Sequence, residues 1–336
     1  MKELTIREIA KMAGVSPTAV SFVLNGKKGV SDQTRKKVEE IIRQTGFKPN
    51  VNSRRLFFKK SFNIAIVIKQ TSSPFNDLFY FEITKGVMEK SKEAGYNVVF
   101  TEIMPMDNSF TLPEVILNRD ADGIIFYQDT DQRILSQVDK LDIPYVVVDA
   151  HTTSQDFTWV TSDWQAGAYK ATKFLLDNGH RDIGFIGSSF IPDYYVQAFT
   201  GFKNALDEGG LAINPAWMEI TALDEETAYG CMERILDTKS RPTAMFCAGD
   251  IFAIGAMKCV KDRGIAIPED ISFISMDDIL LSRYIEPALT TIGVDKVKMG
   301  ILAVELLLKK MDGQNPESIL VPTDEIVIRQ SVKVLK

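Results

Sequence analysis

The chain has 336 residues, 45% hydrophobic and 25% charged, a composition typical of a globular protein with two or three domains. Its three cysteines form no CxxC pair, which argues against a disulfide framework or a zinc knuckle and favours a reducing, cytoplasmic location. No run approaches the roughly 18 apolar residues of a membrane span. The first residues also lack the apolar core of a signal peptide, so we expect neither membrane insertion nor export.

The charge is divided unevenly along the chain, although its net value is only −6. Residues 1–60 contain 14 Lys and Arg against 5 Asp and Glu, whereas the remaining residues contain 25 against 40. A basic head on an acidic body is typical of a nucleic-acid-binding segment joined to a different kind of domain. A solubilising basic tail is the alternative, but the head also carries a helical pattern.

The first predicted helix has apolar residues at helical spacing from Ile6 to Ala13. Thr5 and Glu8 have the spacing of a capping box at its start, and Gly14 should end it.

A second helix should begin after Ser16, which is a good cap, with Pro17 at the first helical position. A third should begin at Ser31. The apolar residues of the second helix that should pack on the first are Val20, Val23 and Leu24.

Two short helices joined by a glycine-containing turn, with a third to close the core, form a helix-turn-helix unit, and a generic helical bundle is the alternative. The stretch TIREIAKMAGVSPTAVSFVLNGKKGVSDQTRKKVEEIIRQTGFKPN resembles the DNA-binding headpiece of the LacI/GalR family of bacterial transcription regulators. The A-G-V-S turn, the V-S-x-V-L-N helix, the S-x-x-T-R-x-x-V helix and the G-F-x-P-N exit stand in order. The likeness continues through the whole chain.

The resemblance implies that the second helix enters the major groove of an operator. The base-reading positions are then Pro17, Thr18 and Phe22, and the other DNA-contacting positions are Thr5, Ser16, Ser21, Asn25, Ser31 and Thr34.

Phe22 departs from the family pattern, because many members carry Arg there. An arginine can bind guanine bidentately, whereas a phenylalanine can only meet a thymine methyl or pack on sugar. We therefore expect the operator preference at that step to move from G toward T or to weaken. The alternative is that Phe22 packs inward against Ala19 or the linker.

The basic segment after residue 49 resembles the family's hinge helix, which folds on DNA and wedges a leucine into the minor groove. Asn50 could cap this helix, and Leu56 stands at the wedge position. Phe57 and Phe58 follow where the family has small residues, so either could also wedge or could tie the hinge to the body. The cations that would neutralise phosphate are Arg54, Arg55, Lys59 and Lys60.

From residue 62 onward, short apolar runs such as NIAIVI, GIIFY, PYVVVD and TAMFCA alternate with helical stretches. Strands alternating with helices predict parallel, doubly wound α/β sheets. There are too many strands for one small sheet, so two similar halves are expected. This resembles the two-subdomain periplasmic-binding-protein fold that forms the ligand-binding core of the family.

The resulting organisation is a helix-turn-helix domain over 1–49, a hinge over 50–61 and an effector-binding and dimerisation core over 62–336. The resemblance implies three crossings between the halves, which we place near 161, 292 and 322. The first half then comprises about 62–161 and 293–322, and the second about 162–292 and 323–336.

The resemblance also places an effector between the halves, at the carboxyl ends of the strands. Asp149, Asp250 and Asp277 keep three family positions. At four other positions where the family has polar effector-binding residues, this chain has Trp164, Ala198, Gly249 and Val294. Ala198 stands where the family usually has an arginine that hydrogen-bonds sugar hydroxyls. The full expected effector set is Ser73, Phe75, Asp149, Trp164, Ala198, Glu225, Gly249, Asp250 and Asp277.

Two explanations of these replacements stay open. The effector could be an atypical, non-sugar small molecule, cationic or less polar, and this is favoured because paired buried carboxylates are costly without a reason. Alternatively, the site binds no small molecule, and control comes through a protein partner or not at all.

Catalysis is not expected, because the chain has no GxxxxGK[ST] loop and its carboxylates have no identifiable paired roles. With only His151 and His180 as histidines, neither a metal site nor a cofactor is expected. We therefore expect a homodimeric repressor with operator DNA and a small-molecule effector as its partners. A solute-binding receptor is the more distant alternative, and a sugar-modifying enzyme is weaker still.

Overall fold

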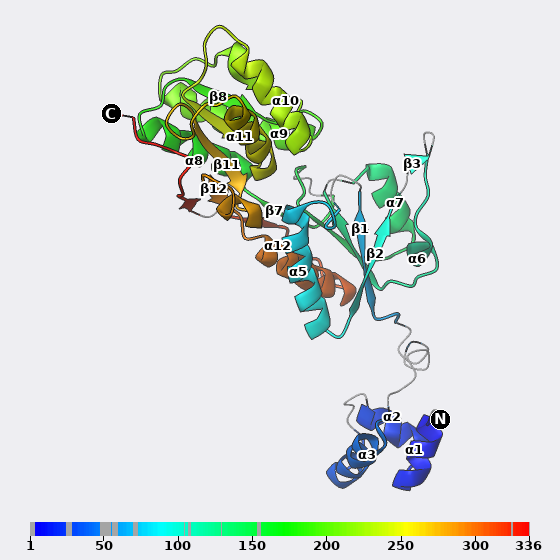
Figure 1. Ribbon diagram of the computed structural model, residues 1–336. Helices are drawn as coiled ribbons and strands as arrows, with labels where there is room; N and C mark the ends of the chain where they lie inside the picture. Colours follow the sequence, from blue (N-terminus) through cyan, green and yellow to red (C-terminus); the bar gives the residue numbers. More distant parts are fainter. Residues whose placement is uncertain are drawn as a thin grey trace. The chain divides into compact units, whose positions relative to one another are not determined.

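The computed structural model describes residues 4–24, 29–47, 55, 60–69, 73–103, 105–106, 109–128, 130–152, 156–323 and 325–335 (Figure 1). The chain divides into two compact units, Met1–Phe62 and Asn63–Lys336. We call them the headpiece unit and the α/β unit and describe each by itself.

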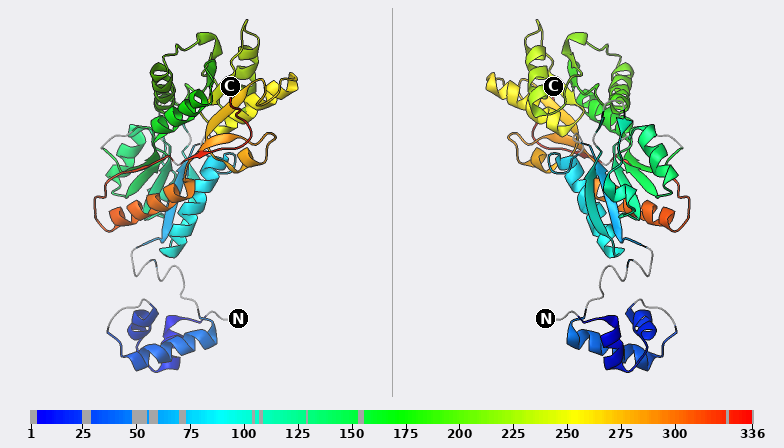
Figure 2. Two further views of the ribbon diagram at one scale, coloured as in Figure 1. Left: turned by 90° about the vertical axis from the view of Figure 1, so that its left-hand side faces the viewer. Right: turned by 90° about the vertical axis from the view of Figure 1, so that its right-hand side faces the viewer.

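The headpiece unit contains helices α1 (Ile6–Ala13), α2 (Pro17–Leu24) and α3 (Asp32–Thr45), shown in blue in Figure 2. The predicted capping box is present, because Glu8 N donates to Thr5 Oγ1 and Thr5 N donates to a Glu8 carboxylate oxygen. Gly14 ends α1 in the left-handed conformation that glycine favours, with a φ of 65°. The buried residues between the helices are Ile9, Ala10, Ala13, Val20, Val23, Val38 and Phe47.

The α/β unit contains two six-stranded sheets, and the predicted doubly wound architecture is confirmed. The first sheet, with its covering helices, is called the N half. Its order is β13-β7-β6-β5-β1-β2, with all neighbours parallel. Its strands are β1 (Asn63–Ile68), β2 (Asn97–Glu102), β5 (Gly123–Tyr127), β6 (Tyr145–Val148), β7 (Trp159–Ser162) and β13 (Ile319–Val321), and its helices are α5 (Leu78–Glu93), α6 (Glu114–Leu117), α7 (Gln132–Lys140) and α12 (Lys296–Met311).

The second sheet, with its helices, is the C half and has the order β14-β12-β11-β10-β8-β9, in which only β14 is antiparallel to its neighbour. Its core includes the free, buried thiols of Cys231, Cys247 and Cys259. Its strands are β8 (Ile183–Ile186), β9 (Met218–Glu219), β10 (Ala244–Cys247), β11 (Ser272–Asp277), β12 (Thr290–Gly293) and β14 (Ile326–Val327), and its helices are α8 (Trp164–Asp177), α9 (Pro192–Glu208), α10 (Glu225–Leu236) and α11 (Asp250–Asp262).

The chain passes between the halves three times. It leaves the first sheet after Ser162, returns to it after Gly293, and crosses last between Val321 of β13 and Ile326 of β14. The central strands are buried on both faces, which explains their continuous apolar runs.

Helices α5 and α12 pack at very close range although they lie more than 200 residues apart in sequence (Figures 1 and 2). A side chain at Gly86 would overlap the carbonyl of Val297, and one at Gly300 would overlap the carbonyl of Ile83. Glycine at both positions therefore lets the two backbones touch. No helix in the described ranges is both long enough and apolar enough to cross a bilayer.

Candidate DNA-binding surface and effector site

Helix α2 presents a small polar surface. The Ser16 hydroxyl accepts a hydrogen bond from Ala19 N at 3.1 Å and so caps the helix start. Pro17 and Thr18 are exposed, whereas Ser21 is half-buried. The opposite face carries Val20 and Val23 into the core, so the helix cannot rotate without losing its packing.

Phe22 lies at the edge of this surface, half-buried rather than in the core. Its ring covers Gly29, where an added Cβ would come within 3.0 Å of the ring. Gly29 has a φ of 120°, which side-chain-bearing residues rarely adopt. The ring is thus supported by the glycine backbone beyond the helix and keeps part of its surface exposed.

Helix α3 begins with a similar cap, because the Ser31 hydroxyl accepts from Thr34 N at 3.2 Å and donates to the Thr34 hydroxyl at 2.9 Å. In the hinge segment, Arg55 Nε donates to the carbonyl of Ser61 at 3.0 Å. The expected DNA contacts Asn25, Asn50, Arg54 and Leu56 lie outside the described residues.

In the α/β unit, a buried polar group lies at the carboxyl end of β6. Asp149 is 3% exposed, and its Oδ2 accepts a hydrogen bond from the Tyr80 hydroxyl at 2.6 Å. His151 Nε2 lies 3.6 Å from the same oxygen. Asp77 caps α5 nearby, and burial raises its pKa to about 6, with a smaller contribution from the charge of Asp149.

Trp164 is the first residue of α8, where Asp163 caps the helix. The Trp164 side chain is 2% exposed, with ring centroids 5.7 Å from Phe79, 6.3 Å from His151 and 5.4 Å from Tyr194. Because Phe79 and His151 belong to the N half, this tryptophan joins the two halves with an aromatic contact.

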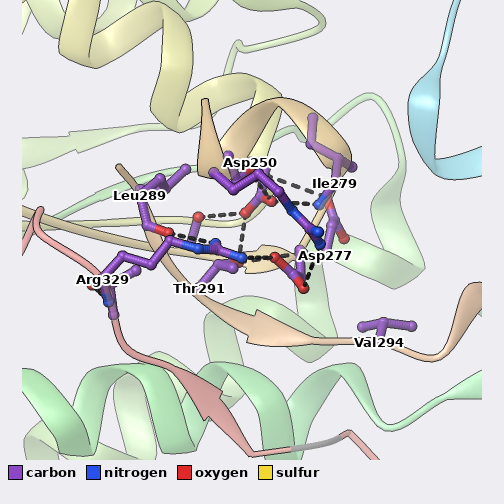
Figure 3. A network of polar contacts seen from close by, with 12 residues as sticks. Asp250, Asp277, Ile279, Leu289, Thr291, Val294 and Arg329 are labelled. Atoms are coloured by element: carbon purple, nitrogen blue, oxygen red, sulfur yellow. Dashed lines mark hydrogen bonds and ion pairs between the residues drawn. The ribbon is translucent and has the colours of Figure 1, made fainter. Parts of the chain in front are cut away.

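Asp250 and Asp277 lie side by side at the carboxyl ends of β10 and β11 (Figure 3). Asp250 N donates to Asp277 Oδ2 at 3.3 Å. Burial and the charge of Asp250 raise the pKa of Asp277 well above its ordinary value. This arrangement places an acidic pair on the C half.

The carboxylate of Asp250 is saturated with donors from the protein itself. It accepts from Ile279 N at 2.8 Å and from the hydroxyls of Ser275, Ser282 and Thr291 (Figure 3). Its lone pairs are therefore used to fix the loop after β11, which favours a positioning role for Asp250 over direct effector contact.

Lys296 supplies a buried cation beside this pair, at the second crossing between the halves. It is 3% exposed, and its ammonium group donates to the carbonyls of Asp277, Asp278 and Val294. Glu82 of the N half lies 3.6 Å away. The side chain of Val294 is itself buried and lies apart from the Asp250 network (Figure 3).

The other expected effector residues divide into two groups. Gly249 adjoins Asp277, and Ser73 and Ala198 are buried. Phe75, however, is 72% exposed and packs on Phe100 at 5.4 Å. Glu225 is exposed at the start of α10, and no described contact joins it to the acidic pair.

Four residues near the buried aspartates at the strand ends were not predicted from the sequence: Tyr80, His151, Tyr194 and Lys296. Only His151 carried a signal, two residues after Asp149. Across the described part of the chain, no three His, Cys, Asp or Glu side chains are gathered as a metal would require.

Comparison with known proteins adds two family matches. Residues 5–50 match the family of bacterial regulatory proteins, lacI family, and residues 172–332 match the periplasmic binding protein-like domain. The HTH-type transcriptional repressor PurR of Histophilus somni is 33% identical over 98% of this chain and 99% of its own length. The ribose operon repressor of Haemophilus influenzae is 32% identical over 99% of each chain.

Solved structures share the fold. The lac repressor dimer bound to operator and the anti-inducer ONPF superposes with a TM-score of 0.81 at 23% identity, covering 99% of this chain and 100% of that one. A LacI family regulator from Enterococcus faecium with bound ribose gives 0.72 at 24% identity, covering 82% of this chain and 100% of that one.

Proposed function

Because the chain belongs to the LacI family of bacterial regulatory proteins, we propose that this DNA-binding transcriptional repressor recognises a pseudo-palindromic operator in the cytoplasm. The main support is the structure of helix α2. Its start is capped by Ser16 and its polar face is partly exposed, while its opposite face is buried in the headpiece core and so fixes the orientation of the helix. Pro17, Thr18 and Phe22 then face base edges. The phosphate-facing donors of the described residues are Thr5, Ser16, Ser21, Ser31 and Thr34.

The proposed active form is a homodimer. A pseudo-palindrome presents two half-sites related by a two-fold axis, and two copies of the headpiece unit match that symmetry. The likeness to the lac repressor, which was solved as a dimer on its operator, supports this form.

The proposed control site is the polar group at the strand ends of the α/β unit, where a small-molecule effector binds. Asp149, Trp164 and Asp277 are the proposed contacts, and Asp250 positions the loop beside them. Effector binding alters the fit of the two halves and thereby the free energy of operator binding. The named relatives are repressors, not enzymes, and no catalytic role is proposed for these carboxylates.

Operator binding is tested by selecting sites from random DNA and measuring mobility shifts with the selected duplex. We expect a palindromic preference and a steep loss of binding between low and moderate salt, because phosphate contacts release counterions. Thr18→Ala should weaken binding by about 1–3 kcal/mol. Met12→Ala, on an exposed α1 position, should not change it. Absence of any DNA binding by the intact chain would contradict the proposal.

Effector binding is tested by isothermal titration against sugars, nucleosides and amines. Heat with one class identifies the effector chemistry. No heat across the panel contradicts a small-molecule effector and favours control through a protein partner.

A further inference from the structure

Tyr194 lies in the first turn of α9 and is only 8% exposed. It stands one helical turn before Ala198, on the same face of the helix. Ala198 is itself fully buried.

The Tyr194 ring meets residues of both halves. Its centroid lies 5.1 Å from His151 of the N half and 5.4 Å, edge-on, from Trp164 of the C half. Both distances are in the range that aromatic pairs prefer. The Tyr194 hydroxyl donates a hydrogen bond to the carbonyl of Ala248, directly after β10.

The charges of three expected effector carboxylates act on the Tyr194 phenol. Burial raises the pKa of Tyr194 well above its ordinary value, and the charges of Asp277, Asp149 and Asp250 raise it further. The phenol therefore stays neutral and keeps its proton for Ala248. Of the expected effector residues, Trp164 contacts the Tyr194 ring, and the three aspartates act on the phenol through their charges.

Two hydrogen bonds hold the start of α9 against the N half on either side of Tyr194. Thr152 Oγ1 donates to Asp193 Oδ2 at 2.8 Å, and Gln197 Nε2 donates to the carbonyl of His151 at 2.7 Å. Since residues 193 and 197 flank Tyr194, these bonds fix the helix turn that carries the ring. The position of the ring is thus set by backbone placement as well as by its own packing.

We propose that Tyr194 occupies the effector site as a built-in ligand and joins the two halves without a small molecule. An entering effector has to turn this side chain out, so effector binding and burial of Tyr194 exclude each other. The inference rests on the proposed function, because the group is an effector site only if the repressor is controlled there.

The first test replaces Tyr194 by alanine and adds p-cresol, a small molecule with the structure of the removed side chain. Tyr194→Ala should open a cavity that binds one p-cresol per chain in a saturable titration, because this guest restores the ring contacts with His151 and Trp164 and the hydrogen bond to the Ala248 carbonyl. The wild-type chain should bind none. The matched control is Tyr195→Ala, which removes the next tyrosine of α9, packed on Phe199 at 5.6 Å within the C half.

Failure of folded Tyr194→Ala to bind p-cresol would overturn the inference, and so would equal binding by the wild-type chain. Operator binding, measured in parallel on the wild-type chain without ligand, separates the two proposals. If operator binding is absent, the proposed function fails. If it is present while Tyr194→Ala takes up no p-cresol, only the built-in ligand fails.

A second test uses the unaltered chain, so it does not depend on the folding of a variant. Nitration by tetranitromethane, mapped by mass spectrometry, should be slowed at Tyr194 on the order of tenfold or more relative to the urea-unfolded chain, because reaction requires local opening. Tyr169, whose hydroxyl bonds Glu208 on the surface of α8, should be slowed far less. Equal protection of the two tyrosines would place Tyr194 outside the site and overturn the inference.

Discussion

Phe22 shows how one contact can decide the chemistry of a recognition surface. Its aromatic ring has no hydrogen-bonding group, and it lies over Gly29. Since the ring is only half-buried, its exposed part remains available for a thymine methyl or a sugar.

Replacing Phe22 by arginine is expected to strengthen the preference for G at one half-site position by about 1–3 kcal/mol, because a guanidinium can bind guanine bidentately. Selection of binding sites from random DNA measures this directly. Identical sequence preferences for both versions would mean that Phe22 does not face the operator.

Asp250 supports a stability prediction. Asp250→Asn replaces one carboxylate oxygen by an amide donor, which leaves hydroxyl donors among Ser275, Ser282 and Thr291 without an acceptor. Each unsatisfied buried donor costs about 1–3 kcal/mol, so the free energy of unfolding of the α/β unit should fall by at least that amount. Urea denaturation measures it.

The matched control is Asp262→Asn, which removes a surface ion pair with Lys258. That change should cost less than about 1 kcal/mol. Equal losses in the two variants would mean that the Asp250 network does not stabilise the loop.

At the scale of elements, much of the architecture was predictable from the sequence. The helices of the headpiece unit follow from Thr5, Ser16 and Ser31 as caps, and the central strands follow from apolar runs such as NIAIVI. Strand β12 carried no such pattern, and β13 offered an apolar run of only three residues. In β12, Thr290 and Thr291 are buried because distant partners such as Ser331 and Asp250 satisfy their polar groups.

The sequence predicted a residue of the candidate site only where its position could be read locally, without knowing which distant residues it contacts. Asp149 directly follows β6 and Asp277 is the last residue of β11, which agrees with the strand ends at which the resemblance placed them. The contact between His151 and Tyr194 joins residues 43 positions apart on different halves, and no local pattern encodes how the halves meet. Glu225 and Phe75 are exposed in the structure, and no local pattern in the sequence predicted that exposure.

The close packing of α5 on α12 predicts opposite outcomes for two glycine replacements. Gly86→Ala should destabilise the α/β unit by about 1–3 kcal/mol, because the added methyl group overlaps the Val297 carbonyl and the helices must separate. Gly230→Ala, in α10, meets only the end of the Arg234 side chain at 3.6 Å. It should stabilise by about 0.5–1 kcal/mol, because alanine lowers the entropy cost of folding a helix.

Thermal or urea unfolding of the two variants distinguishes these effects. A loss of stability in both would mean that helix interiors in this unit tolerate no added methyl group, and that the α5–α12 approach is not special.

At the scale of the whole molecule, carboxylates from the two halves influence one another. Asp77 and Asp149 come from the N half and Asp277 from the C half, and the charge of Asp77 helps to raise the pKa of Asp277. The repulsion between these carboxylates therefore lowers the stability of the folded chain by an amount that varies with pH.

The folded-state pKa of Asp77, about 6, lies above its ordinary value of 3.8, so the folded chain holds an extra proton between these values. Stability from this group is present at low pH and is lost as pH rises through the window from 3.8 to 6. Asp77→Asn should therefore be more stable than the wild-type chain at pH 7, by about 1–3 kcal/mol, and the difference should vanish near pH 4.

The control is Asp131→Asn at the start of α7, where hydrogen bonds from Arg133 lower the pKa of the aspartate to about 2. That variant should be less stable than the wild-type chain at pH 7, and its deficit should shrink as pH falls from 3.8 toward 2. Urea midpoints across the pH range measure both variants. The same pH trend in both would contradict the assignment for Asp77.

The three crossings have a consequence for the order in which the chain can acquire its structure during synthesis. The first sheet needs β13 and the second needs β14, so neither half can be completed before residues 319–327 have been synthesised. The core of the headpiece unit, by contrast, is complete at Phe47. Because domains fold as units while the chain emerges, a product interrupted before these residues would have a finished headpiece unit without a finished α/β unit.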